Sequence, residues 1–175
     1  NYSYELHKAV EYRLIALLED KDVDIRIAAI ETLVSHRRGI FEIYKLGNKG
    51  PDEQKMAVVK ALGITRSECN FDDVIVLQLK SENSLLCSEA IRALVTLAGH
   101  CWKPQEERVK EYCSAILPLL EHPDQVVRRD AVVALADLQY EEFFSVIEPL
   151  LKDESPEVRR AAVQAFMLEG SGEHM

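Results

Sequence analysis

The sequence predicts an all-α protein of about five stacked pairs of antiparallel helices. A nine-residue pattern returns five times, starting at residues 25, 54, 86, 127 and 158, with apolar residues at helical spacing. The starts are 29, 32, 41 and 31 residues apart, which is enough for two short helices and two tight turns. No segment shows the sustained alternation of a strand. A fixed repeat of this length is typical of stacked helical units rather than of a fold built around a catalytic site.

The bulk composition limits the classes of function. The 175 residues suffice for one domain, and the net charge of -9 argues against a nucleic-acid-binding domain, whose affinity rests on cationic contacts to phosphate. None of the four cysteines forms a C-x-x-C pair, which argues against a metal knuckle. No apolar run approaches the roughly 18 residues that span a bilayer. We therefore expect a cytoplasmic protein without a membrane partner. No signal peptide or initiator Met precedes the first helix, which suggests a processed chain or an excised fragment.

The first helix pair is expected at about 4–38. The turn Asp20-Lys21-Asp22 separates its helices, because these carboxylates can cap free amides at the start of the next helix. The second helix runs from about Val23 to Val34, and Arg37-Arg38-Gly39 ends it with cations near the helix terminus and glycine as the stop.

The second pair, at about 39–66, is the least regular. A short helix over Ile40–Leu46 is closed by the segment 47–50, which contains two glycines. Pro51 then opens the next helix at a position where its missing N–H costs little.

The last three pairs follow the same plan of helix, turn and helix. They are predicted as Asp72–Leu79 and Ser84–Ala98 (pair at about 71–100), Glu106–Leu120 and Val126–Leu138 (about 105–139), and Glu141–Leu151 and Glu157–Leu168 (about 141–168), with Asp72 or Asp73 and Ser84 as caps. The 41-residue interval holds an inserted loop around Trp102. The chain is thus expected to be one repeat domain over 4–168 with a flexible tail at 169–175.

One position of the pattern is reserved for small side chains. Its residues in the five second helices are Ala29, Val58, Ala90, Ala131 and Ala162. A small side chain lets neighbouring helices approach closely, and large apolar residues on either side fill the space between units. A single helix pair cannot bury this face, but a stack can.

Three segments that each contain a turn resemble HEAT repeats. They are 17–26, 119–128 and 150–159, each running from a Leu-Leu pair through an acidic turn to an arginine. The resemblance extends over roughly 4–168, is strong in units one, four and five, and is closest to the short HEAT-like units. It implies an α-solenoid with a right-handed superhelix, in which the second helices line a concave surface.

The resemblance also gives the arginines a structural reading. In HEAT-like repeats a turn aspartate and the following arginine often form a ladder between units. Arg26, Arg128 and Arg159 match the arginine position, Lys55 matches in part and Cys87 departs from it; Asp22 and Asp124 match the turn acid, and Ser155 departs. We expect these arginines to bond carboxylates and turn carbonyls, with contact to a ligand as the alternative.

Binding of a partner protein is the leading functional hypothesis. An extended stack offers a large preformed surface, lined by the third and seventh positions of each pattern, four residues apart on one helix face. These positions are Ile27, Glu31, Met56, Lys60, Ser88, Arg92, Arg129, Val133, Arg160 and Gln164. Their basic bias in units four and five suits a partner segment with acidic and apolar residues. Solvated positions without a partner are the alternative reading.

Trp102 is a second candidate contact. It anchors a partner if its loop is exposed, or it folds back over the gap between units three and four.

Other functions find little support. The chain has no nucleotide-binding glycine motif, no G-x-S-x-G and no H-E-x-x-H, so no catalytic residue, cofactor or metal site is expected. Two alternatives stay open: an enzyme that resembles the phycobilin lyases in its short repeats, and nucleic-acid binding by a local stripe. That stripe would consist of Arg37-Arg38, Arg128-Arg129 and Arg159-Arg160.

Overall fold

The computed structural model describes residues 2–64, 72–100, 106–140 and 142–170, and over these residues the chain is helical, without a strand. The α-helices are α1 (Tyr2–Ala16), α2 (Val23–Ser35), α3 (Ile40–Lys49), α4 (Asp52–Ile64), α5 (Asp72–Gln78), α6 (Ser84–His100), α7 (Glu106–Ile116), α8 (Gln125–Asp137), α9 (Phe143–Ile147) and α10 (Pro156–Gly170). Short 3-10 helices follow three of them at Leu17–Glu19, Leu117–Glu121 and Glu148–Lys152. The all-α prediction is confirmed.

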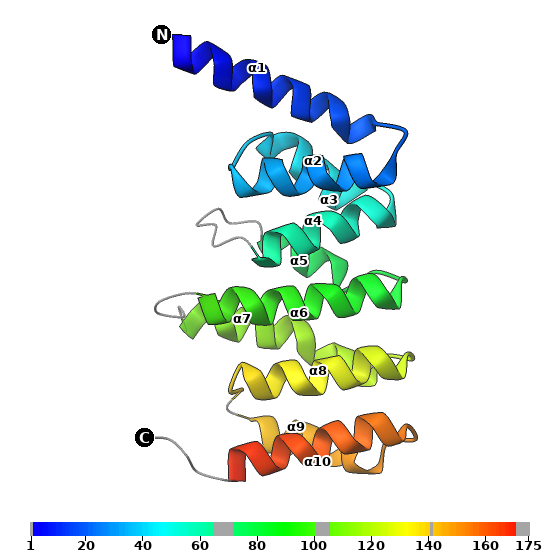
Figure 1. Cartoon of the computed structure of the whole chain (residues 1–175). Coiled ribbons are helices and arrows are strands. Elements are labelled where there is room, and N and C mark those ends of the chain that lie inside the picture. Colours follow the sequence, from blue (N-terminus) through cyan, green and yellow to red (C-terminus); the bar gives the residue numbers. More distant parts are fainter. Residues whose placement is uncertain (1, 65–71, 101–105, 141, 171–175) are drawn as a thin grey trace.

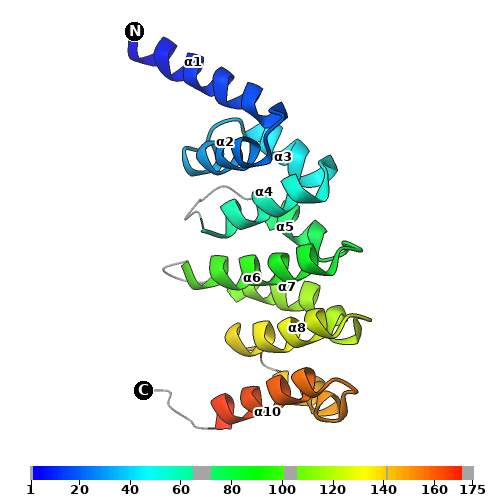
Figure 2. The same cartoon turned by 45° about the vertical axis from the view of Figure 1, so that its right-hand side comes forward.

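The helices form a two-layered stack. The even-numbered helices α2 to α10 lie in one row, and each packs against the next; these four contacts are the most extensive between helices (Figure 1). Helices α3, α5, α7 and α9 form the second layer, which Figure 2 shows beside the first. Helix α1 lies beyond α2 and diverges from it, so α1 and α10 lie at opposite ends of an α-solenoid (Figure 1).

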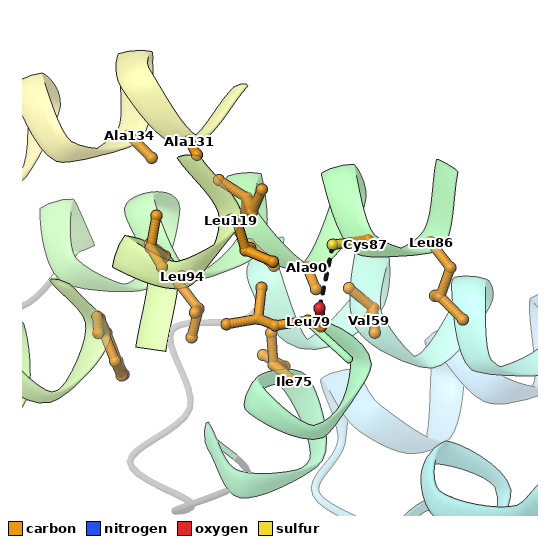
Figure 3. Close-up of a cluster of buried hydrophobic side chains, with 14 of the residues drawn as sticks. Val59, Ile75, Leu79, Leu86, Cys87, Ala90, Leu94, Leu119, Ala131 and Ala134 are labelled. Carbon is orange, nitrogen blue, oxygen red and sulfur yellow. Dashed lines mark hydrogen bonds between the residues drawn. The ribbon is translucent and has the colours of Figure 1, made fainter. Parts of the chain in front are cut away.

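The core follows the predicted register. The small-residue position is buried in every second helix, with Ala90, Ala131 and Ala162 at 0% exposure. Figure 3 shows how side chains of consecutive units meet around Ala90 of α6. Val59 of α4 and Leu79, which directly follows α5, lie on one side of α6, and Ala131 and Ala134 of α8 lie on the other. Burial of this kind stabilises each unit only in the presence of its neighbours.

Two predicted helices are shorter than expected. The prediction of an uninterrupted helix over Glu106–Leu120 is wrong, because the α-helix ends at Ile116 and a 3-10 turn with Pro118 follows. The fifth pair repeats this feature, with α9 ending at Ile147 and Pro149 near the start of the next 3-10 turn. Proline lacks the N–H that continues an α-helix, and near the start of a new turn that loss costs little.

Two predicted boundary residues also have different roles. Gly47 does not end its helix, since α3 continues to Lys49; instead it lies against Val74 of α5, where a side chain would collide. Ser84 does not cap α6. Asn83 does so, because its Oδ1 accepts from the amides of Leu85 (3.1 Å) and Leu86 (3.3 Å).

Candidate functional site

The turns between paired helices are joined along one edge of the stack by arginines. Nη1 of Arg26 donates a hydrogen bond to the carbonyl of Asp20 in its own turn, at 2.7 Å. Its Nη2 donates to Glu53 Oε1 of the next unit, also at 2.7 Å. The same side chain therefore closes its own turn and ties that turn to the following unit.

Arg128 makes the same kind of link with greater burial. Its Nη1 donates to the carbonyls of His122 (2.8 Å) and Pro123 (3.0 Å) in its own turn. Its Nε and Nη2 each donate to Asp153 of unit five at 2.9 Å, and both side chains are only 8% exposed. Arg159 also bonds its own turn, at the carbonyls of Asp153 (2.7 Å) and Glu154 (2.9 Å). The expected bonds to both turn carbonyls and carboxylates are confirmed for Arg26 and Arg128, whereas Arg159 shows only the carbonyl bonds among the described residues.

The acidic partners differ from the expected ones. The resemblance placed Asp22 and Asp124 in the ladder, but each caps its own helix, accepting from the amides of Asp24 (2.9 Å) and Val126 (2.8 Å). For Asp22 this confirms the capping role that its turn predicted. The carboxylates that pair with arginine are Glu53 and Asp153, which lie one unit further on. A carboxylate at the cap position accepts hydrogen bonds from the free amides of the first helical turn.

The links through unit three use neutral donors, because Cys87 stands where the arginine would be. Asn83 Nδ2 donates to Asp52 Oδ2 of unit two at 3.0 Å. A hydrogen bond from Ser84 lowers the pKa of Asp124 in unit four below its ordinary value. The Cys87 thiol donates to the Leu79 carbonyl at 3.3 Å (Figure 3), and burial raises its pKa to about 11, so it stays protonated.

The predicted binding positions fall into three groups. Exposed side chains are those of Glu31, Lys60, Arg92, Val133, Arg160 and Gln164, and those of Ile27, Met56 and Arg129 are half-buried. Ser88 is 2% exposed, so its placement on the outward face is wrong. The third position lies at the border with the neighbouring helices, and α6 is flanked by α4 and α8. Trp102 lies outside the described residues.

A network of four charges joins α6 to α8 on this face, and sequence reasoning missed half of it. Arg92 donates to Glu89 at 2.5 Å and lies 3.5 Å from Asp130 Oδ2. Arg129 donates twice to Asp130 Oδ1, from Nε at 2.9 Å and from Nη2 at 2.5 Å. Asp130 is 8% exposed. Two of the arginines expected to attract a partner are thus paired already; the spacing of Glu89 to Arg92 was the signal available in the sequence.

A cleft of about 260 Å³ lies beside this network, between α6 and α8. Its apolar wall includes Val95 and Val133, and its polar wall includes Arg92, Asp130 and Asp137. Partial burial raises the pKa of Asp137 above its ordinary value. The cleft is large enough for one apolar side chain, with hydrogen-bonding groups at its rim.

Several arginines of the alternative cationic stripe are engaged within the protein. Arg128 is 6% exposed and engaged between units, and Arg129 pairs with Asp130. Arg159 lies at the turn. Within the segments that the structure describes, no group of three or more His, Cys, Asp or Glu side chains has the arrangement of a metal site. None of the helices in those segments has the length and apolar composition for crossing a bilayer.

Comparison with known proteins agrees with this architecture. Residues 113–172 match the family model for HEAT repeats. Residues 113–172 thus carry HEAT repeats. No curated protein matches the sequence closely enough to add to that assignment.

Two solved structures resemble most of the helical stack. Both are crystal structures of engineered proteins, each with a TM-score of 0.60 and 21% identity to this chain. The alignment covers 89% of this chain and 77% of the first engineered protein, and 91% of this chain and 47% of the second. The chain therefore spans about half the length of the second. At this identity the likeness establishes the fold alone.

Proposed function

We propose that this HEAT-repeat protein is a non-enzymatic scaffold that binds a partner protein along the row of second helices. The observation that carries the proposal is the continuous face formed by α2, α4, α6, α8 and α10 (Figure 1). Contacts within this row are more extensive than those between successive first helices. In a curved stack the more closely packed layer is the inner one, which supports a concave face.

Units four and five are the part of this face best suited to a partner. Val133 is 45% exposed at the cleft between α6 and α8, so an apolar side chain of the partner would enter there. Arg160 is exposed on the adjacent α10 and forms no ion pair with any carboxylate that the structure describes. An acidic residue of the partner would pair with Arg160 rather than with the already neutralised Arg92 or Arg129.

We place this interaction in the cytoplasm. Cys87 and Cys113 are free and buried, and such thiols persist where the surroundings are reducing.

The test uses two charge-changing variants with matched controls. The bait protein is used to isolate a partner from lysate, and the affinity of the recovered partner is then measured by calorimetry. Val133→Asp on α8 is paired with Leu77→Asp on α5, because the two wild-type side chains are 45% and 46% exposed. Arg160→Glu is paired with Lys80→Glu, another exposed cation.

The proposal expects Val133→Asp and Arg160→Glu each to weaken binding by about tenfold or more, as loss of an interface contact of 1.4 kcal/mol would. The controls in the other layer should leave the affinity unchanged. A partner that is lost with Leu77→Asp but retained by Val133→Asp would place the binding surface on the opposite layer and reject the proposal.

A further inference from the structure

The last helix of the stack exposes a position that is covered in the four preceding units. The sixth residue of the nine-residue pattern is turned toward the following unit. Its relative exposure is 0% for Ile30, 0% for Val59, 1% for Ile91 and 0% for Val132, but 44% for Val163 on α10. The residue type stays apolar while its cover is missing from the part of the chain that is described.

Met167 extends the same exposed stripe by one helical turn. It occupies the position directly after the pattern, and the equivalent residue of α4 is Gly63. A Cβ on Gly63 would lie 3.0 Å from the Cβ of Ala93, so this position approaches the next second helix closely. On α10 the position is 69% exposed and holds a large flexible apolar side chain, a type suited to adaptable contacts.

Arg159 adds an incomplete polar link at the same end. Arg26 and Arg128 each bond their own turn with Nη1 and a carboxylate of the next unit with other guanidinium nitrogens. Arg159 makes the first of these contacts but pairs with no carboxylate among the described residues. A guanidinium fixed in orientation by its turn carbonyls is prepared for a bidentate carboxylate.

We propose that this outer face of α10 binds one further antiparallel helix pair of the same repeat type, carried by a partner protein and bearing an aspartate or glutamate in its turn. The partner's second helix packs on Val163 and Met167, and its turn carboxylate pairs with Arg159. The interface thus continues the geometry of the α8–α10 contact. A second copy of this chain does not offer the same surface, because its α2 is already contacted by α1.

The test fuses a further helix pair of the same repeat type to the end of α10, which holds it at a high effective concentration. Residues 169–175 are replaced by a second copy of residues 138–170, which preserves the 31-residue spacing between the last two patterns. Amide hydrogen exchange is then followed in α10 and, as a check that the stack is folded, in α8.

The proposal expects exchange in α10 to slow by about tenfold or more in the extended protein, since an end helix becomes an internal one. Val163→Ala should accelerate exchange of α10 strongly in the extended protein and little in the original one. Replacing the copied turn aspartate, the counterpart of Asp153, by asparagine should reverse part of the protection.

Three results would overturn the proposal. Exchange in α10 could stay unchanged by the extension while α8 remains protected. In a second possible result, an extended protein that carries both the asparagine in the copied turn and Val163→Lys could show exchange in α10 as slow as that of the unaltered extended protein. The unextended protein could sediment as a dimer that Val163→Lys dissociates, which would make a second α10 face the occupant.

Discussion

Arg128 and Asp153 form a bidentate ion pair between units four and five, with Nε–Oδ2 and Nη2–Oδ1 distances of 2.9 Å. Each side chain is 8% exposed, and Arg128 also binds two carbonyls of its own turn. Nearly all its donors are therefore used inside the protein. Loss of one partner of such a pair is costly, because the other charge is left buried without its counter-charge.

The first prediction concerns removal of this arginine. Arg128→Ala should lower the free energy of unfolding by about 3–5 kcal/mol, since Asp153 would remain buried without its partner. Arg26→Ala is the matched control: its partner Glu53 is 42% exposed, so the loss of that ion pair should cost only about 1 kcal/mol. Urea unfolding of both variants measures the difference; equal losses would show that burial does not set the strength of the link.

The second prediction is the pH dependence of the same link. The hydrogen bonds from Arg128 hold the pKa of Asp153 below its ordinary value. A carboxyl with a lowered folded-state pKa stabilises the protein above its unfolded pKa of about 3.9, and this stabilisation is lost as the pH falls through the folded value. The difference in unfolding free energy between wild type and Arg128→Gln should therefore be full at pH 7 and shrink from about pH 4 downward. A difference that grows toward acid would contradict the assignment.

The sequence was sufficient for the parts of the fold that repeat. The Ala131 position and its equivalents recur at fixed spacing, and burial follows because the small residue lies where helices meet. The exposure of a side chain that depends on one particular neighbouring helix could not be predicted from the repeat. The third pattern position is exposed in Arg160 on the last helix and buried in Ser88 between α4 and α8, although both have the same local pattern.

The ladder illustrates the same limit for the polar site. The arginine positions were recognised because they recur, but their carboxylate partners were placed in the wrong residues. Asp124 and Asp153 both follow a Leu-Leu pair but lie at different positions of their turns. Asp153 meets Arg128 of the preceding unit, whereas the unit before Asp124 has Cys87 at the arginine position. Asp130 escaped notice because its contact with Arg92 joins two helices far apart in sequence.

A third prediction compares two glycines inside helices. Gly47→Ala should destabilise the protein by about 1–3 kcal/mol, because the new Cβ would collide with Val74 Cγ1 of α5. Gly99→Ala, in α6, has no neighbour within 4 Å and should stabilise by up to about 1 kcal/mol through helix propensity. Thermal or urea unfolding gives both values. Val74→Ala should relieve the Gly47→Ala defect, and failure of this rescue would argue against the α3–α5 contact.

The last prediction concerns Ser88, whose Oγ is buried and has no hydrogen-bond partner among the described residues. A hydroxyl in this situation has lost its water without gaining a partner, whereas a methyl group has no such requirement. Ser88→Ala should therefore stabilise the protein by up to about 1 kcal/mol in urea unfolding. Thr96→Ala provides the contrast, since its hydroxyl is exposed and donates to the Arg92 carbonyl at 2.8 Å. A loss of stability with Ser88→Ala larger than that with Thr96→Ala would mean that the Ser88 hydroxyl is bonded in solution, and that position three of α6 is more open than its 2% exposure indicates.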